Sequence, residues 1–367
     1  MTKANETKEA WEAWRDNEIE RAHSELTRLG YTLKNDQPHI SGERFLMSGR
    51  KLVLLAKRMN DNKEAIVKYS TDHEGRAEIQ DERRRRDGLE HIHFAYHQMR
   101  FPDELLWEDH AGHSLLITEF IPQRTIFIEL PLEEQFFLAL SALESQEGVH
   151  VAVSNHEREI EALAGSMRAD DYLREFDGWR ERIRALLPDS TELNETLFYA
   201  STFLREHRTT IERYSGFLTH TDFVPHNLRV SDGRITILDH TSLIIGNKYE
   251  SWARFINFMT LYNPKLEELL VRYVRENRGA DEYLCLRAMR AYKIGFLLDY
   301  RVTSLMQADG NLRELTKERI VVWKEALEAV LEDKQLSEEA LAHYKKSAIA
   351  LRSPEETVRQ QEISGWK

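Results

Sequence analysis

Three polar residues lie close together in HTDFVPHN, the stretch from residue 220 to residue 227. They are His220, Asp222 and Asn227, and Pro225 lies between the last two. An aspartate carboxylate orients or deprotonates a hydroxyl, and an amide oxygen is a ligand for magnesium. Pro225 fixes one backbone torsion and so stiffens the loop. We expect a ring nitrogen of His220 to brace the loop backbone.

A second aspartate follows this loop at the end of a predicted hairpin. LRV and ITILD alternate in hydropathy around SDG, and Asp232-Gly233 is typical of a tight turn. Asn227 precedes the first strand and Asp239 ends the second, so the hairpin brings their side chains together. Amide and carboxylate oxygens are hard ligands of the kind that magnesium takes. The sequence therefore predicts a magnesium site at these two residues, with Asp222 directed to a different atom.

This set of side chains matches what phosphoryl transfer requires. One carboxylate acts on the attacking hydroxyl, and two other groups hold the magnesium that neutralises the phosphates. The alternative interpretation is a polar loop without chemistry, because His, Asp and Asn also arise at these offsets by chance. The hairpin and the second aspartate favour the catalytic interpretation.

The stretch resembles the catalytic loop and metal-binding aspartate of the aminoglycoside phosphotransferase and choline kinase superfamily, relatives of the protein kinases. Loops of that superfamily typically read His-Gly-Asp, four residues and Asn. Here they read His220-Thr221-Asp222, then FVPH, then Asn227. Thr221 replaces the usual glycine, and His226 stands where glycine is common. Both departures leave the chemical residues in place.

The resemblance spans about residues 40–260 and implies a two-lobed, α+β protein-kinase-like fold. Its N-lobe is a small antiparallel sheet, and its C-lobe is mostly helical. The implied activity is ATP- or GTP-dependent phosphorylation of a small-molecule hydroxyl with Mg²⁺. In that scheme Asp222 is the catalytic base or orienting group, with His220 beside it in the catalytic loop. Asn227 and Asp239 hold the magnesium.

The resemblance also implies a nucleotide site in the N-terminal half. A strand lysine holds the phosphates in kinases, and a glutamate from the next helix pairs with it. Lys68 in EAIVKYS fits the lysine, although an ordinary strand lysine is the alternative. Glu78 and Glu82 are four residues apart on the following helical segment, and Glu82 is nearer to the superfamily spacing. We therefore expect Glu82 to position Lys68.

Two further segments are expected to contact the nucleotide. The turn SGRK has one glycine and no G-x-G-x-x-G, yet backbone N–H groups of Ser48, Gly49 and Arg50 are predicted to contact phosphates. A plain hairpin turn is the alternative. TEFI resembles a kinase hinge, whose main-chain groups at Glu119 and Ile121 pair with a purine. The alternative there is a buried connecting strand.

The N-terminal part of the chain is predicted to hold a helix and a small sheet. Residues 5–29 have apolar side chains at helical spacing, which indicates an amphipathic helix. RFLMSG, KLVLLAKRM and EAIVKYS are short apolar runs between polar turns, and they predict a three-stranded antiparallel meander over about residues 44–70. A charged helix from Ala77 and a strand from Ser114 follow.

The remainder of the chain is predicted to be mostly helical. Helices run from Pro131 to Ser215 and again from Tyr249 to the end, with the short strands GFLTH, LRV and ITILD between them. The chain is therefore divided into an N-terminal helix (1–30), a nucleotide-binding N-lobe (31–121), a helical C-lobe with the catalytic loop and substrate pocket (122–352), and a polar tail (353–367).

Composition and charge narrow the class of protein. The 367 residues, 41% of them hydrophobic, suffice for two packed units. A net charge of -12 argues against nucleic acid as the main ligand. Cys285 is the only cysteine, so no disulfide forms within the chain, which indicates a reducing compartment. No apolar signal core and no run of about 20 apolar residues occurs. We expect a cytoplasmic protein with no membrane partner, and its oligomeric state stays open.

The segment from Glu144 to Asp177 is acidic. It holds nine Asp and Glu residues against three arginines. Relatives build part of the acceptor pocket after the hinge, and acids that line a cleft concentrate cations. The segment therefore predicts a positively charged acceptor, such as an amine-bearing sugar or an amino alcohol. A solvated helix face is the alternative.

Two other function classes remain alternatives. The first is a catalytically idle kinase-like protein that binds a partner, and the intact Lys68, Asp222, Asn227 and Asp239 argue against it. The second is a protein kinase. The chain lacks an Ala-Pro-Glu segment, and only about ten residues separate Asp239 from the next helix, too few for a long activation loop.

Two charged features outside these motifs have simpler interpretations. The run Arg83 to Arg86 is expected to form a solvated helix face. In the superfamily, an acidic residue on the helix after the metal aspartate steadies the catalytic loop, and Glu250 is the candidate for that role.

Overall fold

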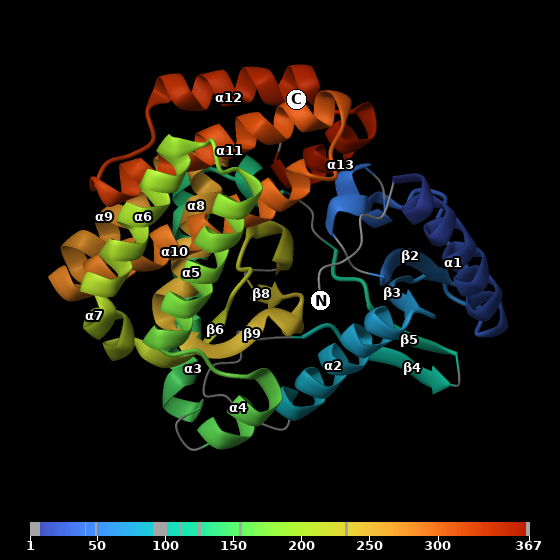
Figure 1. Cartoon of the computed structure of the whole chain (residues 1–367). Helices are drawn as coiled ribbons and strands as arrows, with labels where there is room; N and C mark the ends of the chain where they lie inside the picture. Colours follow the sequence, from blue (N-terminus) through green and yellow to red (C-terminus); the bar gives the residue numbers. More distant parts are fainter. Residues whose placement is uncertain are drawn as a thin grey trace.

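The molecule has two lobes, which lie side by side in Figure 1. The computed structural model describes residues 8–40, 42–47, 50–90, 101–110, 112–122, 126–153, 156–231 and 234–364. One lobe is a small antiparallel sheet with two helices, and the larger lobe is helical. The predicted α+β, kinase-like fold class is confirmed.

The N-lobe is a five-stranded antiparallel sheet with the strand order β1-β2-β3-β5-β4. Helix α1 packs on one face of it, where alternate residues of β2 and β3 are buried together with Leu26 of α1. The opposite residues of the same strands, such as Val53 and Lys68, face the larger lobe and line a cavity. The elements are α1 (Lys8–Arg28), β1 (Tyr31–Leu33), β2 (Leu52–Arg58), β3 (Glu64–Ser70), α2 (His73–Glu90), β4 (Glu104–His110) and β5 (His113–Glu119).

The predicted meander is correct in its second and third strands and wrong in its first. KLVLLAKRM and EAIVKYS form the hairpin of β2 and β3. The segment RFLMSG does not form a strand, because residues Gly42–Met47 form the 3-10 helix η2. The partner of β2 is instead β1, which starts just after Gly30 ends α1 at a φ of 80°. A short apolar run does not distinguish a strand from a helical turn by periodicity alone.

The larger lobe is built on two buried helices. Asn247 caps α8, since its side chain accepts a hydrogen bond from Tyr249 N–H at 2.9 Å. Almost every residue of α8 is buried, and α10 packs along it. The lobe's elements are α3 (Leu132–Val153), α4 (Glu157–Ala164), α5 (Ala169–Leu186), α6 (Thr191–Glu206), α7 (Arg208–Arg213), β6 (Ser215–His220), β7 (Leu228–Ser231), β8 (Arg234–Ile237), β9 (Leu243–Asn247), α8 (Lys248–Tyr262), α9 (Pro264–Asn277), α10 (Ala280–Leu305), α11 (Gly310–Leu331), α12 (Glu338–Leu351) and α13 (Pro354–Ser364).

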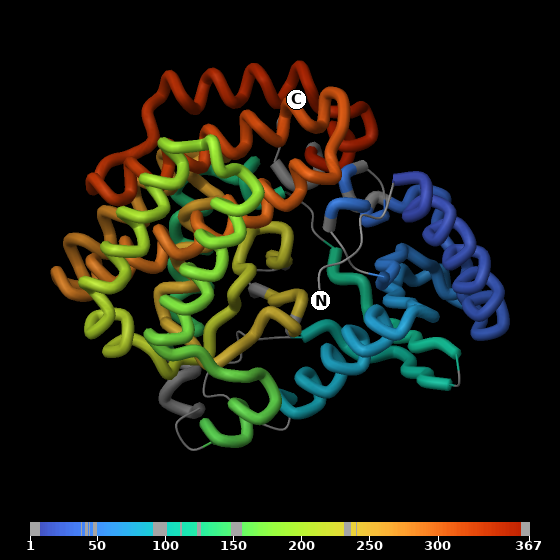
Figure 2. Tube along the Cα trace, viewed as in Figure 1, coloured from blue at the N-terminus to red at the C-terminus, as the bar shows by residue number. Residues whose placement is uncertain are grey.

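The segment after residue 352, expected to be a polar tail, forms helix α13. This helix packs against η1 (Pro38–Ile40) and η2, so the C-terminal end of the described chain lies against the N-terminal part (Figure 2). Glu356 of α13 is fully buried there. The boundaries assigned at residues 30, 121 and 352 stay predictions. Among the described helices, none is both long and apolar enough to cross a membrane.

Candidate active site

The catalytic loop and the second aspartate are joined by the predicted hairpin. Strands β7 and β8 pair in antiparallel register, with Leu228 opposite Ile237. The pairing continues by one further hydrogen bond at the open end, where Leu238 N–H donates to Asn227 O at 2.8 Å. Asn227 and Asp239 therefore lie beside each other at the open end of the hairpin, as the sequence predicts.

Asp222 is held from two sides. Arg254 Nε of α8 donates to Asp222 Oδ1 at 2.8 Å, and Asn227 Nδ2 donates to Asp222 Oδ2 at 3.0 Å. Burial raises the pKa of Asp222, but Arg254 and two neighbouring histidines, His226 and His220, lower it more, so the net pKa lies below its usual range. The side chain is therefore an oriented carboxylate at neutral pH. Arg254 was missed by the sequence analysis.

Asp239 adopts an unusual backbone conformation, with a φ of 59°. Asp is among the few residues that tolerate this left-handed region. Thr241 Oγ1 donates to Asp239 Oδ1 at 2.6 Å, and Ser242 Oγ donates to Oδ2 at 3.0 Å. Burial raises the pKa of Asp239, while Lys68 and the hydrogen bond from Thr241 lower it further than burial raises it. The carboxylate is thus fixed and ionised.

His220 is completely buried and braces the hairpin rather than its own loop. One ring nitrogen, Nε2, lies 3.0 Å from Leu238 O, the residue before Asp239. The backbone of His220 is held by Ser251 of α8, whose Oγ accepts from His220 N–H at 2.9 Å. Ser251 Oγ in turn donates to Gln146 Oε1 at 2.7 Å.

The expectation that Glu250 steadies the catalytic loop is wrong. Its carboxylate points away from the loop and accepts hydrogen bonds from Tyr172 Oη at 2.7 Å and Lys293 Nζ at 3.0 Å. The next residue on α8, Ser251, points to a different side of the helix, because consecutive side chains on a helix lie about 100° apart. Ser251 therefore contacts the loop in place of Glu250.

Lys68 and Glu82 form the ion pair expected from the sequence. Lys68 Nζ on β3 donates to Glu82 Oε1 on α2. Burial raises the pKa of Glu82, but Lys68 and Lys51 lower it more, so Glu82 is ionised. Lys51 Nζ lies 3.7 Å from Glu82 Oε2 and 3.7 Å from Glu78 Oε2. Lys51 is a second cation at this site, and the sequence analysis missed it.

The turn SGRK lies partly outside the described residues, since Ser48 and Gly49 are not among them. The guanidinium of Arg50 stacks on Trp14 of α1, 4.9 Å from the ring centroid, and so points away from the cavity. Lys51, the next residue, lines the cavity instead. The contact of Ser48, Gly49 and Arg50 backbone groups with phosphates stays a prediction.

The basic run on α2 is not a solvated face, apart from Arg84. Arg86 is 5% exposed and pairs with Glu90. Arg85 Nη1 reaches the other lobe and donates to Thr241 O and Leu243 O, each at 3.0 Å. These carbonyls follow Asp239, so Arg85 ties the helix that carries Glu82 to the loop that carries Asp239.

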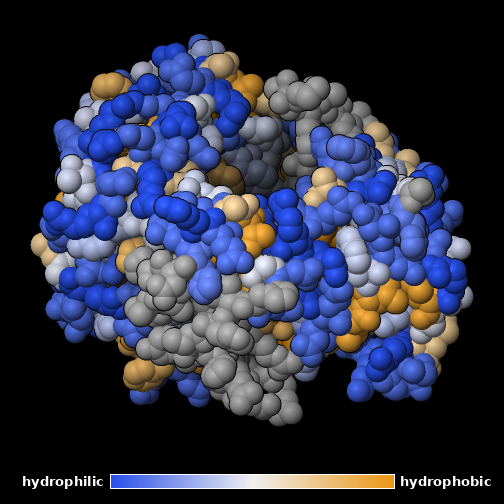
Figure 3. Space-filling model, turned by 90° about the horizontal axis from the view of Figure 1, so that it is seen from below, coloured by the Kyte–Doolittle hydropathy of each residue, from blue (hydrophilic) through white to orange (hydrophobic). Residues whose placement is uncertain are grey.

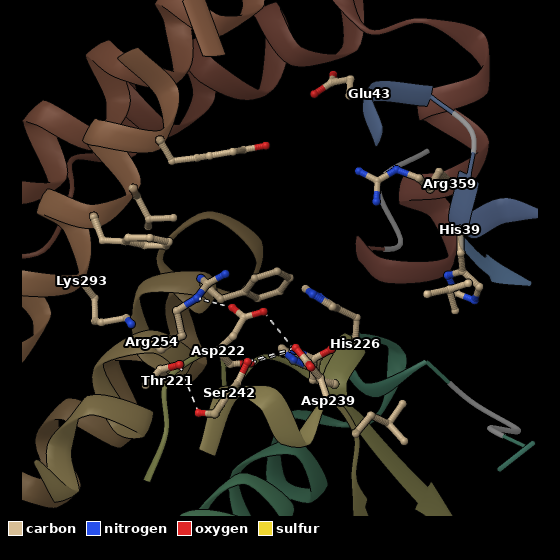
Figure 4. Close-up of a pocket in the computed structure, with 18 of the residues that line it drawn as sticks. His39, Glu43, Thr221, Asp222, His226, Asp239, Ser242, Arg254, Lys293 and Arg359 are labelled. Atoms are coloured by element: carbon tan, nitrogen blue, oxygen red, sulfur yellow. Dashed lines mark hydrogen bonds and ion pairs between the residues drawn. The ribbon is translucent and has the colours of Figure 1, made fainter. Parts of the chain in front are cut away.

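The side chains that carry charge or metal ligands line one cavity of about 1190 Å³ between the lobes: Lys51, Lys68, Glu82, Asp222, Asn227, Asp239 and Arg254. Figure 3 shows a hollow between the lobes on a mostly hydrophilic face, and Figure 4 shows Asp222 and Asp239 on the cavity floor. Glu119 and Ile121 line it, beside apolar residues of β2, β3 and β5. Glu119 N–H is already bonded to Asp103 O at 2.9 Å, whereas Ile121 N–H makes no backbone hydrogen bond within the described residues.

A scan against protein-family models and a search of curated proteins give no match. Solved structures do match. A thermostable mutant of the aminoglycoside phosphotransferase APH(4)-Ia, in complex with ADP and hygromycin B, aligns at TM-score 0.51 and 14% identity, covering 85% of this chain and 97% of that one. A macrolide 2'-phosphotransferase type I aligns at TM-score 0.52 and 11% identity, with 86% and 98% covered. The macrolide 2'-phosphotransferase MphH from Brachybacterium faecium aligns at 0.50 and 14%, with 83% and 98% covered.

The chain has the fold of the aminoglycoside and macrolide phosphotransferases. The resemblance found in the catalytic loop is thereby confirmed at the level of the fold. At 11–14% sequence identity, these alignments show a shared fold and do not assign roles to individual residues. The role of each residue is therefore argued from its position and contacts in this structure.

The acidic segment does not line the acceptor side of this phosphotransferase fold as expected. Of its nine acids, only Glu175 lines the cavity, where its carboxylate accepts from Tyr292 Oη at 2.6 Å. Others are neutralised elsewhere: Asp170 pairs with Arg208, for example. The prediction of a cationic acceptor therefore loses the basis that it had in the sequence.

Proposed function

We propose that the protein transfers a phosphoryl group from a purine nucleoside triphosphate, ATP or GTP, to a hydroxyl of a small molecule. One observation supports this most strongly. The Lys68–Glu82 pair on the N-lobe and the group of Asp222, Asn227 and Asp239 on the helical lobe face the same cavity. Phosphoryl transfer needs a phosphate-binding cation, an oriented acceptor and a metal site within one cleft.

The nucleotide would occupy the end of the cavity beside the sheet. Lys68 binds its phosphates, held in place by Glu82, and Lys51 adds a second positive charge. The purine lies between apolar residues of the sheet and Leu238, next to main-chain groups at Glu119 and Ile121. Structures with this fold support a nucleotide here, because one holds ADP and another holds ATP with streptomycin.

The side chains at the hairpin fit a magnesium ion. Asn227 uses its Nδ2 for Asp222, and its Oδ1 accepts no hydrogen bond from the described residues. Each oxygen of Asp239 accepts a single hydrogen bond. Hard oxygen donors of this kind match the ligand preference of Mg²⁺. Bound there, the ion would neutralise charge on the phosphates.

Asp222 would orient the acceptor hydroxyl. Its low pKa makes it a weak base, and its two hydrogen bonds fix its direction, so positioning is its main contribution. His220 acts through the hairpin, because it supports the carbonyl of Leu238 beside Asp239. It is a positioning residue rather than a group that touches the substrate.

A phosphotransfer screen tests this function. Hydroxylated small molecules are incubated with MgATP or MgGTP, and phosphorylated product is detected by mass. We expect at least one acceptor to be phosphorylated, and we expect Asp222→Asn to lower the rate by about 10²–10⁴ while nucleotide affinity is unchanged. Equal turnover in the variant and the wild type would remove Asp222 from the mechanism.

A further inference from the structure

One face of helix α10 forms a wall of the cavity beyond the catalytic loop. Lys293, Phe296, Leu297, Tyr300 and Arg301 all line the cavity. They recur every three or four residues and so form a single stripe on the helix. From the first to the last, the stripe extends about 12 Å along the axis. This end of the cavity lies away from the sheet and is the acceptor side in the proposed function.

Two acidic residues across the cavity from this stripe already have cationic partners. Glu43 of η2 accepts from Arg319 Nη1 at 2.6 Å and from Nη2 at 3.0 Å. Glu356 of α13 accepts from Arg359 Nε at 2.8 Å and from Nη2 at 2.6 Å. Figure 4 shows Glu43 and Arg359 across the cavity from Asp222. These two carboxylates are therefore neutralised without any help from α10.

Arg301 has no such partner. Among the described residues, no carboxylate lies within ion-pair distance of its guanidinium, and its Nε is buried without a hydrogen bond. Its guanidinium carbon lies 4.9 Å from the centroid of the neighbouring Tyr300 ring. Burial and then the nearby Arg319 lower the pKa of Arg301 more than Tyr300, Glu43 and Tyr344 raise it. A partly buried guanidinium without an anion costs stability, so an anionic group bound in the cavity beside Arg301 would be stabilised.

We propose that Arg301 binds an oxyanion on the acceptor, a carboxylate or a phosphate ester, while the acceptor hydroxyl lies at Asp222. The inference rests on the proposed function and specifies its substrate class as anionic. The planar guanidinium suits this role, because its N–H groups match carboxylate and phosphate oxygens two at a time. Aromatic residues Trp323 and Tyr344 line the same part of the cavity and would pack on the body of the acceptor.

The test is an anion titration of the full chain by thermal unfolding. Magnesium and a non-hydrolysable ATP analogue are present at saturation, so that phosphate cannot occupy the nucleotide end. Sodium phosphate or sodium malonate is compared with sodium chloride at equal ionic strength. A ligand of the folded state raises Tm with concentration, and its Kd follows from the rise. Phosphate binding tighter than malonate identifies a phosphate ester, and the reverse identifies a carboxylate.

Three variants distinguish anion binding at Arg301 from a general effect of positive charge in the cavity. Arg301→Gln should weaken anion binding by about tenfold or more, and Arg301→Lys should weaken it less, because it keeps the charge. Arg182→Gln is the matched control, since Arg182 also lines the cavity but already pairs with Asp299 at 2.7 Å. That variant should bind the anion as the wild type does. Without anion, Arg301→Gln should have a higher Tm than the wild type, because it loses an unpaired charge.

The outcomes are separable from those of the proposed function. Failure of the nucleotide analogue to bind contradicts the phosphotransferase proposal, and it is read in the same samples. Anion binding that Arg301→Gln leaves unchanged overturns the oxyanion site. A lower Tm in Arg301→Gln together with unchanged anion binding would make Arg301 structural and also overturn it. If phosphate and malonate raise the Tm of the wild type no more than chloride does, the oxyanion site is also overturned.

Discussion

Arg254 and Asp222 form the central pair at the residue scale. Arg254 is largely buried and donates to one carboxylate oxygen, while Asn227 donates to the other. A positive charge next to a carboxylate favours its ionised form. Arg254 therefore both directs Asp222 toward the cavity and keeps it ionised as the pH falls.

Arg254→Gln should lower kcat by about tenfold or more, since a charge-assisted hydrogen bond is worth about 1.5–3 kcal/mol. Arg254 lowers the pKa of Asp222, so its loss should raise that pKa and move the acidic fall in activity to higher pH. The measurement is kcat against pH, with Arg254→Lys as the control that keeps the charge. A profile identical to the wild type in Arg254→Gln would contradict this role.

The predicted hairpin was sufficient to bring Asn227 and Asp239 together, and the resemblance to the kinase superfamily implied the Lys68–Glu82 pair. Each pair is fixed by local geometry, one between a strand and the next helix, the other at a hairpin. Arg254 was not predictable in the same way. It reaches Asp222 only because α8 packs against the loop with that face, and packing of this kind depends on the whole lobe.

At the scale of elements, α8 and α10 are joined by a buried ion pair. Lys293 of α10 and Glu250 of α8 are 5% and 1% exposed, and Tyr172 of α5 also donates to Glu250. A buried pair adds little net stability, but removal of one partner leaves an uncompensated charge. The network therefore holds the stripe of α10 in register with the helix that carries Arg254.

Lys293→Met should lower the free energy of unfolding by about 3–5 kcal/mol, because Glu250 would be left buried and unpaired. The double variant Lys293→Met with Glu250→Gln should recover much of that loss, since neither charge remains. Urea unfolding of the single and double variants measures both values. A double variant no more stable than Lys293→Met alone would show that the pair is not the source of the effect.

One element was predicted wrongly, for a physical reason that concerns its neighbours. Residues Gly42–Met47 have strand-like apolar content, yet they form η2 because α13 and α1 cover them. Residues 354–364 are polar in sequence and form α13. Glu356 is nevertheless buried, since Arg359 and the backbone of Glu43 satisfy its charge. Neither contact is visible in a local window of sequence.

At the scale of the whole molecule, the lobes are connected on both sides of the cavity. Arg85 of α2 holds the loop after Asp239, and Arg319 of α11 holds Glu43 of η2. Arg319 is 4% exposed. These contacts set the relative position of the lobes, and with it the distance between Lys68 and Asp239 across the cavity.

Arg319→Met should lower the Tm of the whole chain, because Glu43 loses the partner that neutralises it. Combined with Glu43→Gln, the same substitution should be much less harmful. Differential scanning calorimetry measures both, and Lys317→Met serves as a control, since its exposed pair with Glu314 contributes little. Equal Tm losses for the single and double Arg319 variants would exclude an ion pair between the lobes as the cause.

The central claim is that the cavity binds a magnesium–nucleotide complex through both lobes. Calorimetric titration with ATP and with GTP, each with and without Mg²⁺, tests it directly. We expect the wild type to bind at least one of them more tightly with Mg²⁺, and Asp239→Ala and Lys68→Ala to weaken that binding by about tenfold or more. Asp222→Asn should bind as the wild type does, because Asp222 acts on the acceptor. No binding at millimolar nucleotide, or Mg²⁺-dependent binding that Asp239→Ala leaves intact, would contradict the account.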